Sequence, residues 1–220
     1  MMSLFERQSP LIGEICQEKL RTSKVLIAGV GGLGCNVSET LTRSGIGEIY
    51  LVDDDIVSET NIHRQILYTL NDVGEKKVEV AKEKLESVGF HTKINALFSR
   101  IDEKFQLPQI NVIVDCLDNA HSKILLSEMA ARKGIPFVHG GVNGYFGQVL
   151  SLKGKSLKGL LSFPQKEEKY VIAQTVSLTA SIQSMEVMKI LCDMENKLMN
   201  KILFLDLLNY DFEVVKIEDV

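Results

Sequence analysis

The sequence predicts an α/β protein with a mainly parallel sheet, helices on both faces of that sheet, and antiparallel strands that extend it at the C-terminal end. Two observations predict the parallel part. Short apolar runs alternate with helical patterns up to about residue 140, and the first run leads directly into a glycine-rich turn. The third observation predicts the extension, because the strand-like segments beyond Gly147 are interrupted by only one long helix.

The first two thirds of the chain contain the alternation of strands and helices. A helix over 10–22 precedes the run Lys24–Ala28, which is apolar after its first residue and is expected to be a buried strand. A helix over 35–44 stops at Gly45, since glycine commonly ends helices. The later elements in this part are expected strands over 48–53, 92–96, 111–115 and 135–139, short helical pieces between 61 and 70, and helices over 76–88 and 122–133.

The last third has a different pattern. Strands are expected over 148–152, 202–208 and 212–217, with a long helix over 175–194. The segment 153–169 has several lysines and few apolar anchors, so it is expected to be a mobile loop that acts as a lid. We therefore expect a single domain over 1–220, with its core in 1–150 and the loop, long helix and antiparallel extension in 151–220.

Composition excludes several classes of protein. The formal net charge is −4 with both signs interspersed, which argues against a nucleic-acid partner. No apolar stretch is long enough to span a membrane, and charged residues occupy the segment where a signal peptide would lie. The four cysteines contain no Cys-x-x-Cys pair, so they predict neither a zinc site nor a disulfide framework. A reducing cytoplasm fits this pattern best.

The most informative motif is a glycine turn that follows the first strand. It reads Gly29-Val-Gly31-Gly32-Leu-Gly34, and Asp53 ends the next strand about 20 residues later. This is the spacing of a Rossmann-like site, in which backbone N–H groups bind phosphate and the carboxylate binds ribose hydroxyls. The alternative for Asp53 is a solvated strand end.

A second group of residues suits a polyphosphate. Asn61, Arg64 and Gln65 share one face of a helical turn, and the fork of Arg64 suits phosphate oxygens. Taken alone, Arg64 is better explained as part of a surface salt bridge. Lys77 stands at the start of a helix, where the dipole disfavours a cation unless an anion lies nearby. The alternative for Lys77 is a solvated, lysine-rich helix.

Asp118 ends the strand over 111–115 within the stretch Asp115-Cys116-Leu117-Asp118-Asn119. Mg²⁺ prefers one or two carboxylates together with phosphate oxygens and water, so Asp118 is the candidate metal ligand. The alternative for Asp118 is a cap on the helix that follows. In this fold ligands bind beyond the carboxyl ends of the strands, so Asp118, His139 and the glycine turn are expected to meet in one crevice.

These motifs, in this order, resemble the ThiF/MoeB/HesA adenylyltransferases, the bacterial and archaeal relatives of ubiquitin-activating enzymes. The resemblance covers nearly the whole chain. Besides the glycine turn it rests on Leu51-Val-Asp53-x-Asp55-x-Val57-Ser58-x-x-Asn61-x-x-Arg64-Gln65, Val73-Gly74-x-x-Lys77-Val78-Glu79, Asp115-Cys116-x-Asp118-Asn119 and Gly147-Gln148.

The resemblance implies a homodimeric enzyme that uses ATP and Mg²⁺ to convert a carboxylate into an acyl-adenylate with release of pyrophosphate. It implies that Asp53 binds ribose, that Asp118 holds Mg²⁺, and that a further set of residues holds the nucleotide: Asp55, Asn61, Arg64, Gln65, Lys77 and Asn119. Arg7 matches more loosely an N-terminal arginine that reaches into the partner subunit's active site. The catalytic group would be Arg7, Arg64, Lys77 and Asp118.

The chain departs from the family at its cysteines. The zinc-binding Cys-x-x-Cys pairs of many members are absent, one near 158–161 and one beyond Val220, so no zinc is expected. The loop before the long helix has no cysteine, which puts thioester or persulfide transfer in doubt. A helix N-terminus would lower the pKa of Cys35, but all four cysteines are better explained as packing residues. His139 is the one histidine placed to touch substrate.

The carboxylate is left open by the sequence. Family members usually act on ubiquitin-like carrier proteins ending in Gly-Gly. A short zinc-less relative acts on a pyridinol precursor of the guanylylpyridinol hydrogenase cofactor, so a small-molecule carboxylate is the alternative. Two rivals have other functions: an NAD-dependent oxidoreductase, which uses the same glycine turn and Asp53, and a non-catalytic nucleotide-binding subunit.

Overall fold

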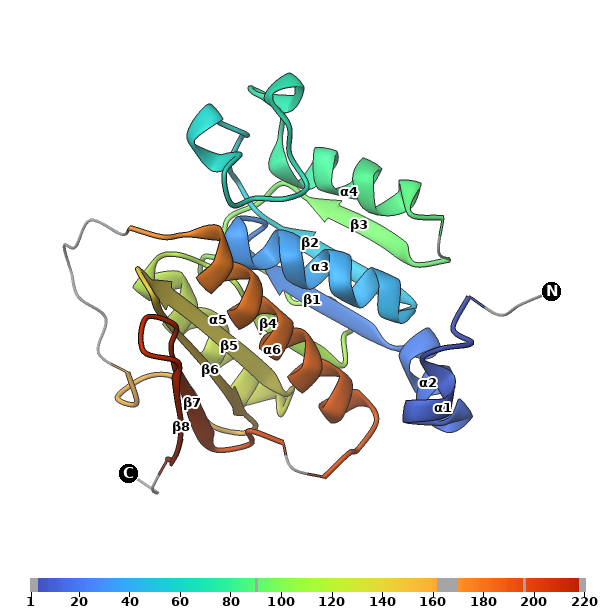
Figure 1. The fold of residues 1–220 in the computed structure, drawn as a ribbon, viewed down its shortest axis with the longest axis vertical. Coiled ribbons are helices and arrows are strands. Elements are labelled where there is room, and N and C mark those ends of the chain that lie inside the picture. Colours follow the sequence, from blue (N-terminus) through green and yellow to red (C-terminus); the bar gives the residue numbers. More distant parts are fainter. Residues whose placement is uncertain (1–3, 90, 162–169, 196, 218–220) are drawn as a thin grey trace.

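A computed structural model describes residues 4–89, 91–161, 170–195 and 197–217. Its centre is an eight-stranded sheet with the order β3-β2-β1-β4-β5-β6-β7-β8 (Figure 1). The first five strands are parallel, and β6, β7 and β8 extend the sheet in antiparallel fashion. The predicted fold class is confirmed.

The strands lie close to where the sequence predicts them. Their bounds are β1 Lys24–Ala28, β2 Glu48–Val52, β3 Lys93–Leu97, β4 Val112–Asp115, β5 Phe137–Asn143, β6 Phe146–Leu152, β7 Lys201–Asp206 and β8 Asp211–Lys216. The largest difference is at β5, which continues past His139 through Gly140 and Gly141. This happens because β5 and β6 form a hairpin in which Asn143 pairs with Phe146.

Helices cover both faces of the sheet. Their bounds are α1 Ser9–Ile12, α2 Glu14–Thr22, α3 Gly32–Ser44, α4 Lys77–Ser87, α5 Ala120–Lys133 and α6 Ala173–Leu191. One hydrophobic cluster joins α2, α3, α4 and α6 to the face that carries Val25 and Ile27. A second cluster joins α5 to the opposite face, which carries Leu26 and Ala28 (Figure 1).

The long helix α6 begins two residues and ends three residues before the expected 175–194, and two further boundaries differ because of glycines. The helix predicted over 10–22 is divided at Gly13, where φ is 80°, into α1 and α2. α3 begins at Gly32 rather than Cys35, so the glycine motif itself forms the first turn of the helix. In both cases local glycine conformation sets the boundary.

The described part of the lysine-rich loop, 153–161, is attached to the core. Leu157 is fully buried, and its N–H donates to Ser127 Oγ on α5 at 2.9 Å. The expectation that this segment has few anchors is therefore wrong for 153–161, because a leucine among the lysines packs into the second cluster. Residues 162–169 of the predicted lid lie outside the described residues.

The expectation that all four cysteines are packing residues is wrong for two of them. Cys16 of α2 and Cys192 at the end of α6 form a disulfide, with Cα atoms 5.0 Å apart. They are 176 residues apart in sequence, and only the packing of α2 against α6 brings them together. Cys35 and Cys116 are free and buried, as predicted.

Candidate functional site

A crevice of about 1370 Å³ runs across the carboxyl ends of the parallel strands and continues over β6 and β7. Its walls come from the segments that follow the parallel strands and from residues within β5, β6, β7 and β8. The residues predicted for the site that line it are Gly29, Gly31, Gly32, Asp53, Asp55, Asn61, Arg64, Gln65, Lys77, Asp118 and Asn119. The structure therefore brings eleven predicted residues, spread over some ninety positions, into one cavity.

The glycine turn is shaped by close backbone contacts. Gly29 has φ 87°, and a Cβ there would lie 2.6 Å from the carbonyl oxygen of Cys116 on the neighbouring strand segment. Gly34 does not line the crevice, but a Cβ on it would collide with the carbonyl oxygen of Gly29. These glycines let α3 start directly against β1, so the unpaired N–H groups of its first turn face the cavity and suit an anion.

Asp53 lies at the end of β2 and is held by backbone N–H groups. Its Oδ2 accepts from Val30 N at 2.6 Å and its Oδ1 from Asp55 N at 2.8 Å. Burial raises the pKa of this carboxyl group, and the Val30 hydrogen bond and the charge of Lys77 oppose that rise. The side chain is only partly exposed, which differs from the alternative of a freely solvated strand end.

Lys77 is a buried cation on the crevice wall. Its side chain is 6% exposed, and its Nζ lies 2.8 Å from Asp55 Oδ2. The alternative of a solvated lysine is therefore wrong for this residue. Since Asp55 is 68% exposed, the ion pair leaves the cation close to any anion that enters the cavity.

Asn61, Arg64 and Gln65 belong to one turn, as predicted. The N–H groups of Arg64 and Gln65 both donate to Asn61 O, at 3.1 and 3.0 Å. Arg64 Nη1 donates to Thr60 O at 2.9 Å, which holds the guanidinium at the cavity rim. Gln65 is 3% exposed, and among the described residues its Oε1 has no hydrogen-bond partner, so a bound group would be its partner.

Asp118 and Asn119 follow β4, and the structure gives these two residues different roles. Asn119 Oδ1 accepts from Ser122 N at 2.8 Å and is the N-cap of α5. The cap predicted as an alternative for Asp118 is therefore made by Asn119, and Asp118 lines the crevice. A carboxylate opposite a phosphate-binding turn is a donor set that fits Mg²⁺ together with phosphate oxygens.

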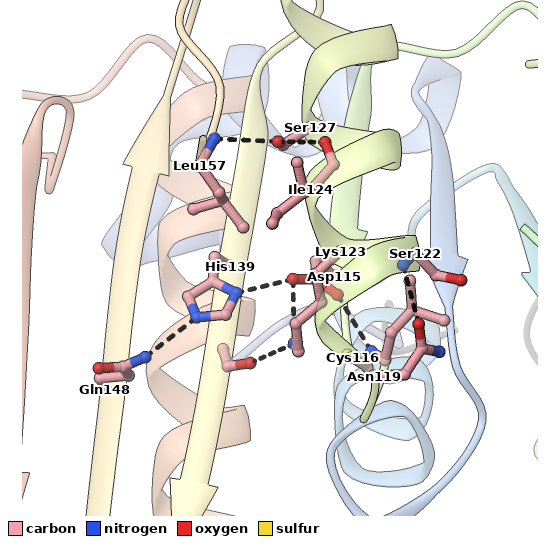
Figure 2. Close-up of polar contacts among 12 residues, drawn as sticks. Asp115, Cys116, Asn119, Ser122, Lys123, Ile124, Ser127, His139, Gln148 and Leu157 are labelled. Atoms are coloured by element: carbon pink, nitrogen blue, oxygen red, sulfur yellow. Dashed lines mark hydrogen bonds and ion pairs between the residues drawn. The ribbon is translucent and has the colours of Figure 1, made fainter. Parts of the chain in front are cut away.

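A buried polar network that the sequence did not predict joins β4, β5 and α5 (Figure 2). Asp115 is fully buried at the end of β4, and its Oδ2 lies 3.0 Å from Lys123 Nζ and 2.7 Å from His139 Nδ1. Lys123 also donates to Gly140 O at 3.1 Å, and Gln148 Nε2 lies 3.2 Å from His139 Nε2. An aspartate at the end of an otherwise β-branched strand was the available signal.

The charges of this network are set by burial and by each other. Burial opposes ionisation of Asp115, but the charge of Lys123 and the hydrogen bond from His139 outweigh it and keep its pKa below the usual value. Burial and the nearby Lys123 lower the pKa of His139. His139 reaches the crevice wall, as expected, but it is fully buried and engaged with Asp115.

Arg7 is exposed and does not line the crevice. Its neighbour Gln8 donates to Ser44 O, at the far end of α3 from the glycine turn, at 2.9 Å. The 13 residues of α3 span about 20 Å at 1.5 Å per residue. Arg7 therefore lies at the opposite edge of the molecule from the site.

The free thiols are poor nucleophiles. Burial raises the pKa of Cys35 to about 12, so the lowered pKa considered for its helix position is wrong. Burial also raises the pKa of Cys116.

Within the described ranges, none of the helices has the length and apolar character needed to cross a membrane.

Comparisons with known proteins agree with the fold described above. Residues 5–219 match the ThiF family. The SAMP-activating enzyme E1 of Haloferax volcanii is 30% identical over 217 residues, which cover 93% of this chain and 80% of that protein. The molybdopterin-synthase adenylyltransferase of Escherichia coli is 31% identical over 213 residues, which cover 91% and 86% of the two chains.

Solved structures show the same fold. The crystal structure of E. coli MccB with MccA superposes with a TM-score of 0.88 at 22% identity. The match covers 98% of this chain and 71% of MccB. At this identity the likeness establishes the arrangement of the sheet and helices.

Proposed function

This chain belongs to the ThiF family, and from that premise we propose that it activates a carboxylate by adenylation. It is an adenylyltransferase: a carboxylate oxygen attacks the α-phosphorus of ATP, the bond to the bridging oxygen breaks, and pyrophosphate leaves. The observation that carries the proposal is the convergence of the α3 N-terminus, Lys77, Arg64 and Asp118 on one crevice. If the chain were a nicotinamide oxidoreductase, Asp118 and Lys77 would have no common role in the reaction.

The residues have distinct tasks in this reaction. The first turn of α3 binds phosphate oxygens, and Asp53 accepts hydrogen bonds from the ribose hydroxyls. Arg64 and Lys77 neutralise charge that moves onto the leaving pyrophosphate. The substrate carboxylate is ionised at neutral pH and needs no general base, so catalysis consists of positioning and charge stabilisation.

Asp118 is the residue that would hold Mg²⁺, with phosphate oxygens and water as its other ligands. Mg²⁺ supplies Lewis-acid charge neutralisation at the phosphates. Within the described residues the buried Oε1 of Gln65 has no hydrogen-bond partner, and together with the carboxylate of Asp118 it suits a bound, hydrated metal–nucleotide complex. No cysteine ligand set for zinc exists in the sequence, and none is part of the proposal.

The carboxylate would enter from the β5–β7 end of the crevice. Sheet order puts the ribose site on β2 and the phosphate turn on β1, so the free end of the cavity lies over β5, β6 and β7. Phe146 and Phe204, 55% and 41% exposed, line that end and suit the apolar part of a substrate. A ubiquitin-like carrier tail is the first candidate, and a small-molecule acid is the second.

We also propose a homodimer in which Arg7 serves the partner's site. The distance of Arg7 from its own crevice supports this arrangement, because an exposed arginine at that edge reaches a crevice only in another subunit. The alternative of a non-catalytic nucleotide-binding subunit is tested by the same assay as the activity.

The deciding experiment is carboxylate-dependent exchange of labelled pyrophosphate into ATP. The enzyme with Mg²⁺ is assayed against Gly-Gly-tailed carriers and a panel of small cofactor-precursor acids. We expect exchange with one class, loss of at least 100-fold in Asp118→Ala, and calorimetric binding of Mg-ATP but not of NAD. Unchanged exchange in Asp118→Ala, despite an unaltered melting temperature, would sink the assignment of this residue.

A further inference from the structure

The buried network beside the crevice has one consistent arrangement of protons. Asp115 Oδ1 accepts from Leu117 N at 3.1 Å, and Oδ2 accepts from Lys123 Nζ at 3.0 Å. Both oxygens therefore act as acceptors, so the group is an unprotonated carboxylate. His139 Nδ1, 2.7 Å from Oδ2, must carry a proton to make this contact.

The protonation state of His139 Nε2 follows from that of Nδ1. The lowered pKa of this imidazole makes it neutral, so with the proton on Nδ1 its Nε2 carries a lone pair. Nε2 then accepts a hydrogen bond and has to face the NH₂ group of Gln148 rather than its carbonyl, at 3.2 Å. The amide orientation of Gln148 is thus dictated by a chain of buried groups that starts at Lys123.

The fixed amide presents its oxygen on the opposite side. Figure 2 shows the nitrogen of Gln148 toward His139 and the oxygen directed away from it. Within the part of the chain that the structure describes, this Oε1 has no hydrogen-bond partner. The side chain lies against Gly141, its partner across the hairpin, where a Cβ would come within 3.0 Å of Gln148 Nε2.

Gln148 occupies the part of the cavity where a substrate rather than the nucleotide is expected. It lines the crevice on β6, directly opposite Phe204 of β7. The neighbouring Gly140 and Gly141 are also part of this wall, and their missing side chains make room for Gln183 and for Gln148 itself. Gln148 is half-buried on the crevice wall, so an N–H group of a substrate in this part of the cavity can reach its Oε1.

We propose that Gln148 selects substrates by accepting a hydrogen bond from an N–H group next to the reacting carboxylate, and that His139 is the positioning residue that aims it. Between the two candidate substrates of the proposed function, Gln148 would favour the peptide tail, whose terminal residue carries an amide N–H. An aromatic or aliphatic acid without this donor leaves the acceptor unpaired and binds more weakly. This inference rests on the proposed adenylation function.

The first test concerns the proton positions and needs no substrate. Histidine is labelled with ¹⁵N in the full chain, and the His139 signal is assigned by its absence in His139→Asn. We expect the Nδ1–H form at neutral pH, with Nε2 at the chemical shift of an unprotonated nitrogen. An Nε2–H form, or a doubly protonated ring at neutral pH, overturns the inferred orientation of Gln148.

The second test uses a matched pair of probes in the exchange assay. One is a peptide ending in Gly-Gly, and the other is its ester analogue, in which oxygen replaces the last amide N–H. Wild type should show about tenfold higher KM for the ester, the effect of one lost hydrogen bond. Gln148→Leu should bring both KM values together without a matching fall in kcat.

The controls separate specificity from folding. Gln109→Leu makes the same substitution at an exposed position near the opposite end of β4 and should keep the wild-type preference. His139→Asn should weaken the preference while Gln148 is still present, which a purely structural role does not predict. Equal KM values for the two probes in wild type, or a preference that survives in Gln148→Leu, overturn the proposal.

Failure of the substrate proposal can be distinguished from failure of the proposed adenylation function. Exchange supported by small acids but not by the peptide overturns the substrate class and leaves adenylation intact. Absence of exchange with every carboxylate contradicts the proposed function, and the substrate class falls with it, whereas the ¹⁵N measurement still decides the orientation of Gln148.

Discussion

Two lysines stand side by side at the start of α4, and their surroundings give them different properties. Lys76 is exposed, and its Nζ lies 4.5 Å from the centre of the Phe98 ring. Lys77 is buried against Asp55 on the wall of the crevice. The sequence distinguishes them only through the family motif, which contains Lys77, whereas burial decides which one acts on an anion.

Replacing Lys77 with Met should reduce kcat/KM for ATP by about 10- to 100-fold, because a buried charged hydrogen-bond donor is lost while the side-chain volume is kept. Steady-state exchange kinetics over a range of ATP concentrations measure the effect. Lys76→Met is the matched control and should change kcat/KM less than twofold. Equal effects of the two substitutions would contradict the role of Lys77.

Acid should destabilise the protein through the network around Asp115. The folded pKa values of Asp115 and His139 lie below their ordinary values. The unfolded chain therefore binds more protons as the pH falls, so the free energy of unfolding decreases below about pH 6.5 through His139 and below about pH 4 through Asp115. Urea unfolding at about pH 8 and about pH 5 measures the loss, which should be smaller in His139→Asn.

At the scale of elements, the sequence predicts which helices and strands exist better than it predicts where each one begins and ends. Strand β1, the glycine turn and α3 follow from an apolar run and a motif, both of which are local. The extra length of β5 depends on pairing with β6, and the break at Gly13 depends on one backbone conformation. The disulfide depends on two helices meeting, for which the sequence contains no signal.

Loss of the Cys16–Cys192 disulfide should lower the free energy of unfolding by about 2–4 kcal/mol, because the link restricts the unfolded chain. Urea unfolding with and without dithiothreitol measures it. The variant with Cys16→Ser and Cys192→Ser is the control and should not respond to the reductant. A wild-type transition that is also unaffected by the reductant would contradict the prediction.

At the scale of the whole molecule, the site residues within one chain could be anticipated because parallel strands end at the same edge of a sheet. Arg7 does not follow this rule. It lies near Ser44, at the end of α3 remote from the crevice. The resemblance implies a catalytic role for Arg7, and in the proposed homodimer this residue would serve the partner's site.

Mixing the inactive variants Arg7→Ala and Asp118→Ala should restore up to about a quarter of wild-type exchange activity, because a mixed dimer contains one site with both residues intact. Subunit exchange is monitored with differently tagged chains, and the unmixed variants are the controls. Complete inactivity of the mixture, with mixed dimers present, would contradict action of Arg7 across the interface.

The hairpin between β5 and β6 has a consequence for how the enzyme can change. On one side of the hairpin the sheet is parallel, and the crevice is lined by residues at the ends of the strands. On the other side the sheet is antiparallel, and the crevice is lined by residues on the faces of the strands. The nucleotide half is tied to the glycine turn and tolerates little alteration. Residues such as Phe146 and Phe204 are partly exposed, so they can be exchanged without disturbing the core. New acids are therefore accessible by substitutions in β6–β8 while the chemistry of ATP is kept.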